Sequence, residues 1–238
     1  MNKRQFGEGP IFTITNYLYW FLLGNIYFVL LNIPFIFIFI TFMLNPQPGF
    51  TLFFLLASIP IGPALIALLS SMGKIVREKD INFTKFFFKA YKTNFFEGIF
   101  YWLLYIITLT IVYIDIIYVK TNFNSKILLI LAQILGVFVV SLGLFIFPII
   151  SRFYFKVKDL LRISIKYFIK NIHIALTNLG IVVILGYMVF KISYLMLVIA
   201  SLICFAIMYL EKGILNDIEE NLETIQNDKD EDKDNLLQ

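Results

Sequence analysis

Long uninterrupted runs of apolar residues dominate this chain and set its architecture. Six runs are long enough for a helix to cross the hydrocarbon core of a bilayer, which takes about 20 residues for a thickness of about 30 Å. Because the runs are continuous rather than alternating, they favour helices over a β-barrel. The sequence therefore predicts an all-α, polytopic transmembrane bundle of about six spans, the fifth being short. The predicted spans are Tyr17–Leu44, Phe50–Met72, Ile99–Val119, Ile127–Ile150, Ile174–Phe190 and Tyr194–Leu210.

Basic residues are distributed unevenly between the segments that join these spans. If the N-terminus is cytoplasmic, 17 of the 20 Lys and Arg lie on the cytoplasmic side and 3 on the other. Because Lys and Arg are retained on the cytoplasmic side, both termini are predicted to face the cytoplasm. The chain then divides into a cytoplasmic N-terminal segment 1–16, a transmembrane domain 17–210 and a cytoplasmic acidic tail 211–238.

Composition agrees with a membrane location. The chain is 60% apolar and 15% charged, whereas soluble domains are about 45–50% apolar and about 25% charged. A soluble fold of this size has too little interior to hide so much apolar surface. The first apolar run is also longer than the roughly 7–15 residues of a signal-peptide core, so it is interpreted as the first span.

Each of the two longer cytoplasmic loops predicts an amphipathic helix with a basic face. The first helix is expected to be capped by Asp80 and to run to about Asn94. Basic amphipathic helices lie in the membrane interface against anionic lipid headgroups. Two interpretations stay open: anchors for the cytoplasmic side, or a docking surface for a cytoplasmic partner. The basic residues of the two loops include Lys85, Lys89, Lys92, Arg152, Arg162, Lys166 and Lys170.

The two loops also lie in a weak internal repeat. Pro63, a basic segment and then Asn94 before a span are echoed by Pro148, a basic segment and then Asn171 before a span. The acidic tail follows the last span and holds ten acidic residues against three lysines. It begins amphipathically and ends in the charged run Asn227–Asn235, which predicts a helix leading into a disordered, solvated end. A contact between the tail and the basic loops is the alternative.

Polar residues inside the spans are the candidates for function, because polar groups in lipid are costly and mark packing or a pathway. Asn25 and Asn32 share one face of the first span, and Asp115 lies in the third. At about 1.5 Å per residue, Asn32 and Asp115 reach a similar depth. Asp115 has three open interpretations: it faces water at the outer surface, it forms a structural hydrogen bond, or it couples to a substrate or ion.

The second span contains Pro60, Gly62 and Pro63, and this segment predicts a kink or break. Such breaks form ion and substrate sites in transporters, and they also occur as packing kinks. Signals for catalysis are absent from the sequence. His173 is the only histidine and Cys204 the only cysteine, which excludes a histidine or cysteine metal cluster. No enzymatic activity, cofactor, metal or nucleic-acid partner is therefore expected.

An ordered set of short motifs over about residues 6–210 resembles the YesL family of bacterial integral membrane proteins, a domain of unknown function. The family usually reads Thr-Ile-Gly-Pro-Ala in the second span, so Pro60 is a departure from its pattern, and the acidic tail is an addition to it. The motifs are Gly9–Phe12, Asn25, Pro34, Ile61–Ala64, Phe86–Lys89, Lys92–Phe95, Asp115 and Phe147–Phe153.

The resemblance implies a function in carbohydrate uptake, because members are often encoded near sugar-uptake ABC transporters and polysaccharide-degrading enzymes. The leading hypothesis is a non-catalytic accessory component of an oligosaccharide ABC uptake system in the bacterial cytoplasmic membrane. Its partners would be anionic lipids and ABC transporter subunits. The alternative is a small secondary transporter or channel. An aqueous cavity reaching Pro60–Pro63 would favour the alternative, whereas a dry bundle with Asp115 at the surface would count against it.

Overall fold

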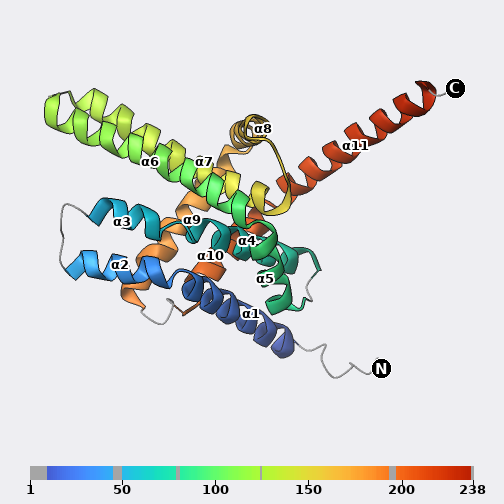
Figure 1. Ribbon diagram of the computed structural model, residues 1–238, viewed down its shortest axis with the longest axis horizontal. Coiled ribbons are helices and arrows are strands. Elements are labelled where there is room, and N and C mark those ends of the chain that lie inside the picture. Colours follow the sequence, from blue (N-terminus) through green and yellow to red (C-terminus); the bar gives the residue numbers. More distant parts are fainter. Residues whose placement is uncertain (1–9, 45–49, 79–80, 124, 193–196, 237–238) are drawn as a thin grey trace.

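The computed structural model describes residues 10–44, 50–78, 81–123, 125–192 and 197–236, and these ranges are helical with no strand among them (Figure 1). The all-α prediction is therefore confirmed. The helices are α1 (Pro10–Leu31), α2 (Ile33–Leu44), α3 (Phe50–Ala57), α4 (Ile61–Glu78), α5 (Phe83–Thr93), α6 (Phe95–Asn122), α7 (Lys126–Arg152), α8 (Val157–Lys170), α9 (Ile172–Lys191), α10 (Ile199–Leu210) and α11 (Lys212–Leu236).

Five helical segments within the described ranges are long and apolar enough to cross a membrane. The pair formed by α10 and the first half of α11, bent by 55°, is a sixth candidate. The short predicted fifth span is α9, a helix of 20 residues. The described ranges thus hold five or six candidate spans, which indicate a multi-pass helical membrane protein. The five segments are Thr13–Leu31, Phe53–Glu78, Phe95–Asn122, Lys126–Ile150 and Ile172–Val189.

The first predicted span, Tyr17–Leu44, is corrected to two helices that meet at Asn32. The Asn32 backbone N–H donates to the Val29 carbonyl at 3.0 Å, which is a tighter pattern than the α-helix. Its side-chain Nδ2 donates to the Phe28 carbonyl at 2.7 Å. The side chain thus bonds the carbonyl to which the Asn32 N–H would donate in a continuous α-helix. Pro34 has no N–H and suits the first turn of a new helix. Hydropathy does not register such a break.

The second predicted span is interrupted between α3 and α4, at the segment that contains Pro60, Gly62 and Pro63. Neither proline has an N–H, so the helical hydrogen bonds cannot continue through them. The Ser58 Oγ donates to the Leu55 carbonyl at 2.7 Å and satisfies one of the acceptors that the interruption leaves. The helix is therefore broken where the sequence predicts a break.

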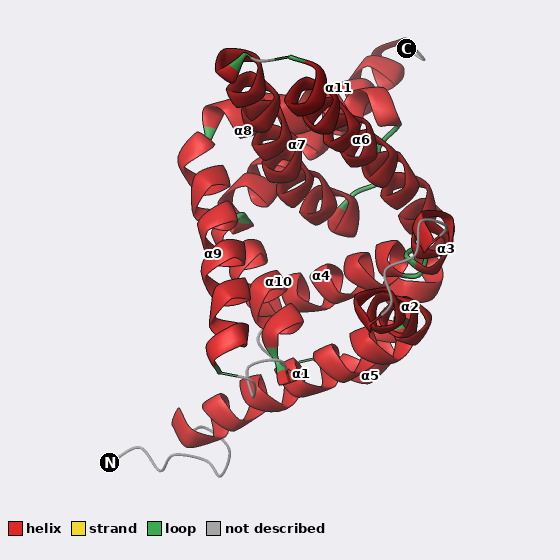
Figure 2. Cartoon of the chain, turned by 90° about the vertical axis from the view of Figure 1, so that its left-hand side faces the viewer, coloured by secondary structure: helices red, strands yellow, loops and turns green. Residues whose placement is uncertain are grey.

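Helix α4 is the buried centre of the bundle, with 11 of its 18 residues buried. It contacts α1, α5, α6, α7 and α10, and Figure 2 shows it beside α10 in the middle of the molecule. Small residues allow this close packing. At Gly73, for example, a β-carbon would collide with the Met208 side chain of α10.

Helices α5 and α8 occupy the two predicted amphipathic loops. Helix α5 buries Phe83 and Phe87 against the bundle, and α8 buries an equivalent face. The cap of α5 is Asn82, whose Oδ1 accepts from the Lys85 N–H at 3.3 Å. This corrects the predicted cap, Asp80, which lies outside the described residues. The helix begins at the buried Phe83, three residues after the charge that suggested a cap.

A single asparagine joins each amphipathic helix to the long helix that follows it. Asn94 stands between α5 and α6, and Asn171 stands between α8 and α9. The Asn171 Nδ2 donates to the Tyr167 carbonyl at 3.0 Å. The Tyr154 hydroxyl, from the α7–α8 loop, donates to the Asn94 Oδ1 at 2.7 Å. These bonds fix the direction of both helices, and the two units follow the same order that the weak repeat indicates.

Two parts of the molecule extend away from the packed centre. Helices α6 and α7 lie side by side as a long hairpin (Figure 1), and only 6% and 11% of their span windows are buried. The second half of α11 extends in another direction (Figure 1), and it is helical where the sequence predicts disorder. The apolar surface of the hairpin is the part of the fold that most requires lipid or a protein partner to cover it.

Candidate functional site

Asn25 links the first span to the last helix of the bundle. It is buried on α1, and its Oδ1 accepts a hydrogen bond from the Ala200 N–H at 3.1 Å. Ala200 lies in the first turn of α10, where backbone N–H groups have no partner within their own helix. Asn25 therefore acts as a capping residue supplied from another helix.

Asn32 and Asp115 lie in different environments. Asn32 is 2% exposed at the α1–α2 break, and its Oδ1 has no hydrogen-bond partner. Asp115 is exposed on α6. No hydrogen bond joins the two side chains among the described residues. The surface position is the one that Asp115 has in the first of its three interpretations, in which it faces water.

The break at Pro60–Pro63 is filled by α6. A β-carbon on Gly62 would collide with the Gly98 carbonyl oxygen and with Trp102. One on Gly98 would lie 2.7 Å from the Pro63 α-carbon. The Trp102 Nε1 also donates to the Ser58 Oγ at 3.4 Å across the same contact. The backbones of α4 and α6 thus touch at the break, as in a packing kink.

The basic side chains of α5 and α8 face outward. Lys85, Lys89 and Lys92 on α5 are exposed, as are the basic residues of α8 at positions 162, 166 and 170. Lys85 and Lys89 also line a surface pocket of about 290 Å³ together with Lys74 of α4. The Lys74 ammonium lies 4.5 Å from the centre of the Phe86 ring. Glu78 also lines the pocket and pairs with Lys74 at 3.4 Å, so the junction of α4 and α5 holds three lysines and one carboxylate.

Arg152 is the more buried of two basic residues that contact the tail. Its side chain is 10% exposed; one guanidinium nitrogen donates to Asn216 at 3.0 Å, and the other pairs with Glu219. Lys170 of α8 pairs with Asp217 at 3.7 Å. The sequence left open whether the acidic tail contacts a basic loop. The structure shows that α11 does so through α7 and α8.

Two tyrosines support these loops outside the spans. Partial desolvation raises the pKa of Tyr154, which is 65% exposed, and the charge of Glu97 raises it further. Burial and Asp217 likewise raise the pKa of Tyr167, against a hydrogen bond from Asn221 that lowers it. Both hydroxyls therefore stay protonated at neutral pH, where Tyr154 donates to the joint between α5 and α6.

The sequence analysis missed a polar pair inside the bundle. Glu211 separates α10 from α11 and is fully buried, whereas it was assigned to a solvated tail. Its Oε1 accepts from the Asn178 Nδ2 of α9 at 2.7 Å. The Glu211 Oε2 and the Asn178 Oδ1, both buried, have no partner. The available signal was an acidic residue directly after the last apolar run and an asparagine within the fifth.

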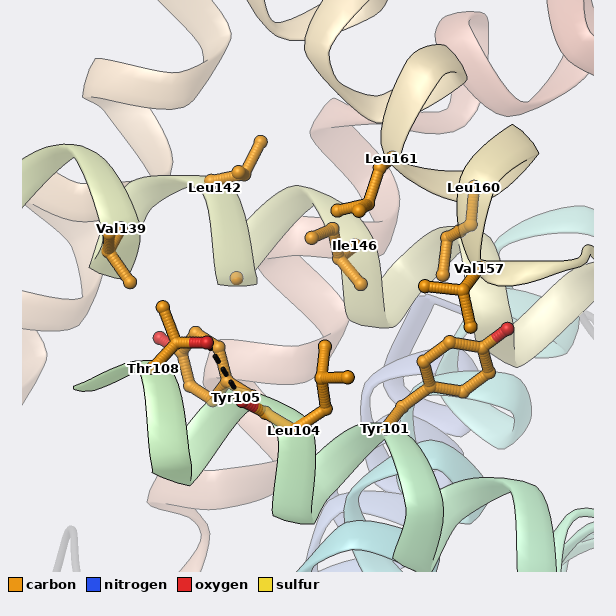
Figure 3. Close-up of a pocket in the computed structure, with 11 residues that line it drawn as sticks. Tyr101, Leu104, Tyr105, Thr108, Val139, Leu142, Ile146, Val157, Leu160 and Leu161 are labelled. Carbon is orange, nitrogen blue, oxygen red and sulfur yellow. Dashed lines mark hydrogen bonds between the residues drawn. The ribbon is translucent and has the colours of Figure 1, made fainter. Parts of the chain in front are cut away.

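A cavity of about 100 Å³ lies between α6, α7 and α8. Figure 3 shows its lining, which is apolar apart from three hydroxyl-bearing residues. Each of these hydroxyls is satisfied by a backbone carbonyl: Tyr101 by Phe155 at 2.7 Å, Thr108 by Leu104 at 2.9 Å and Tyr105 by Val140 at 3.5 Å. Nothing in this lining has the chemistry of a catalytic site.

Within the described residues, no group of three or more His, Cys, Asp or Glu side chains could hold a metal ion.

Comparisons with known proteins give one result. No curated protein and no solved structure matches the chain. Residues 12–116 match the family model described as protein of unknown function, DUF624. Over residues 12–116 the match confirms the resemblance that the sequence motifs suggested, because DUF624 is the YesL-type domain of unknown function.

Proposed function

We propose that this multi-pass protein is a non-catalytic accessory component of an oligosaccharide ABC uptake system in the bacterial cytoplasmic membrane. The observation that carries the proposal is the pair of basic helices, α5 and α8, which the bundle holds in fixed directions. The YesL-type domain supplies the link to carbohydrate uptake, through the resemblance. The proposal assigns no catalytic residues, cofactor, metal or nucleic-acid partner to the chain.

Helix α5 is the better docking element of the two. Its apolar face is anchored by Phe83 and Phe87, while Lys85, Lys89 and Lys92 stay exposed at helical spacing. The basic surface of α8 is partly engaged by the tail through Lys170. Positive surfaces of this kind guide association with an acidic partner and also contact anionic lipid headgroups.

The distribution of charge supports the orientation that the proposal needs. With both termini in the cytoplasm, α5 and α8 face the side on which ABC transporters carry their nucleotide-binding subunits. The exposed α6–α7 hairpin then lies in the membrane, where lipid or transporter helices cover it. Accessory binding thus uses two surfaces: a charged one at the interface and an apolar one within the bilayer.

The test is affinity purification after crosslinking in native membranes, with mass spectrometry of the recovered proteins. Wild type is expected to recover transporter permease or nucleotide-binding subunits. The triple variant Lys85→Glu, Lys89→Glu, Lys92→Glu is expected to lose them, whereas Lys126→Glu, at the far end of the α6–α7 hairpin, retains them. Deletion that leaves both the assembly of the transporter and the uptake of every tested glycan unchanged would contradict the proposal.

The second candidate is a small secondary transporter or channel. A specific observation favours it, namely the buried Glu211 and Asn178, because a carboxyl group buried within a helical membrane bundle often marks an ion pathway. The packed contact between Pro63 and Gly98 counts against a pathway through the α3–α4 break. Transport assays with the purified protein in vesicles separate the two candidates, because an accessory protein alone moves no solute.

A further inference from the structure

Glu211 is a fully buried carboxyl group that the accessory function does not use. It stands at the bend between α10 and α11. A carboxylate that is buried without a positive partner is strongly disfavoured, because one hydrogen bond replaces little of the hydration that it loses. The amide of Asn178 is also completely buried and is directed at this carboxyl.

The charged groups on the surrounding helices are directed elsewhere. Among the described residues, the only side chain that acts on Glu211 is Asn178. The cysteine of α10, Cys204, lies two turns before Glu211 and is neutral as a buried thiol. Arg77 of α4 interacts with Arg152, Glu78 and Glu219. Arg152 of α7 pairs with Glu219, and Lys170 of α8 pairs with Asp217. His173, Tyr209 and Lys212, of α9, α10 and α11, are exposed.

We propose that Glu211 and Asn178 form a binding site for one proton. A proton from the aqueous phase on the Glu211 Oε2 converts the carboxylate to a neutral acid. Its O–H then donates to the Asn178 Oδ1, while the Asn178 Nδ2 donates to the Glu211 Oε1 as observed. One proton thereby removes the buried charge and gives partners to the two oxygens that lack them.

The position of the site gives the bound proton a structural role. Glu211 is the single residue between the helix at the centre of the bundle and the helix that carries the acidic tail. Release of the proton places a charge at this joint, and the charge can be hydrated only if α11 loosens from α7, α8 and α10, which it contacts. Proton binding and docking of α11 are therefore linked.

The first measurement is infrared difference spectroscopy of the full chain in detergent, in H2O and D2O near neutral pH. The wild type is expected to show the C=O band of a protonated carboxyl that shifts on deuteration. Glu211→Gln removes this band, whereas Glu220→Gln, at an exposed position on α11, retains it. A spectrum unchanged by Glu211→Gln would overturn the proposal.

The second measurement is the thermal midpoint as a function of pH. The unfolded chain releases this proton above about pH 4.3, while the folded protein keeps it, so stability falls as pH rises. Glu211→Gln keeps both hydrogen bonds without titrating, and this part of the pH dependence is expected to disappear. If that variant does not fold, Asn178→Asp replaces it: the paired carboxyls share a proton, and the band persists to higher pH than in wild type.

A sodium ion is the competing occupant of the same oxygens. It would bind the ionised carboxyl, so the protonated band would be absent. The midpoint would then rise with NaCl but not with choline chloride at equal ionic strength. That pair of results overturns the proton assignment, as does a pH dependence that is identical in wild type and Glu211→Gln.

Discussion

The missing side chain of Gly98 is what allows α6 to touch α4 at the helix break. Gly98→Ala would place a β-carbon 2.7 Å from the α-carbon and 2.9 Å from the backbone nitrogen of Pro63. Because backbone atoms cannot rotate away as a side chain can, the helices must separate. We expect a loss of about 1–3 kcal/mol of unfolding free energy, measured as a lower thermal midpoint in detergent.

The matched control is Gly180→Ala on α9, where nothing lies within 4 Å of an added β-carbon. Alanine favours a helix over glycine by about 1 kcal/mol, so this variant should be as stable as wild type or more so. Equal midpoints for Gly98→Ala and Gly180→Ala would mean that the α4–α6 contact is looser than described.

Removal of the Asn25 side chain tests its capping role. Asn25→Ala leaves the Ala200 N–H without an acceptor inside the bundle, and loss of a cap costs about 0.5–2 kcal/mol. Asn25→Asp retains an acceptor oxygen and should be less affected at pH values where the carboxyl is protonated. Hydrogen exchange at the start of α10 is the direct measurement. Unchanged exchange there in Asn25→Ala would contradict the capping role.

Tyr154, in the loop between α7 and α8, is expected to make the stability of the folded protein depend on pH. Because its pKa is raised above the ordinary value of 10.0, the folded protein holds the phenolic proton more tightly than the unfolded chain does. The contribution of the protonated Tyr154 hydroxyl to the free energy of unfolding is complete below about pH 10. It is lost as pH rises through the raised pKa. Tyr154→Phe should remove this part of the alkaline loss of stability, together with the hydrogen bond to Asn94. Alkaline unfolding that is the same in both proteins would contradict this assignment.

At the scale of single elements, α11 is half docked and half extended. Ile214, Leu215 and Ile218 are buried, and Arg152 holds the same segment through Asn216 and Glu219. The sequence pattern of apolar residues followed by a charged run therefore marked the docked part correctly. It did not mark Glu211, because a carboxyl group at the head of an acidic tail normally belongs in water.

Arg152→Ala is expected to loosen the docked half of α11. The substitution removes the guanidinium that bonds Asn216 and Glu219 and leaves the apolar contacts in place, so α11 should be displaced only part of the time. The measurement is hydrogen exchange or limited proteolysis over residues 212–224. Arg162→Ala, at an exposed position on α8, is the control and should leave α11 as protected as in wild type.

At the scale of the whole molecule, the orientation in the membrane is a prediction from the distribution of charge and not from packing. Cys204 is the only cysteine and is buried, so a Cys204→Ala background accepts single labelling sites. Asn122→Cys, at the tip of the α6–α7 hairpin, should react with an impermeant maleimide on intact cells. Glu220→Cys should react only after the membrane is opened. The reverse result would invert the topology and move α5 and α8 away from the cytoplasm.

The sequence by itself determined the class of this protein. Apolar runs of spanning length, the bias of Lys and Arg, and the helical spacing in two loops follow from bilayer thickness and helix period, which act locally along the chain. The proline-rich break was also predictable, because proline lacks an N–H wherever it occurs. Motifs in sequence order were enough to identify the YesL-type domain.

Only the tertiary structure decided how these elements meet. The break at Asn32, the cap that Asn25 provides to α10, the filling of the α4 break by Gly98 and the burial of Glu211 beside Asn178 all depend on residues distant in the chain. Hydropathy averages over a window and assigns each residue to water or lipid, whereas a protein core is a third environment in which one carboxyl or amide can be sealed. Contacts that carry function in such a core are therefore visible only after the helices have packed.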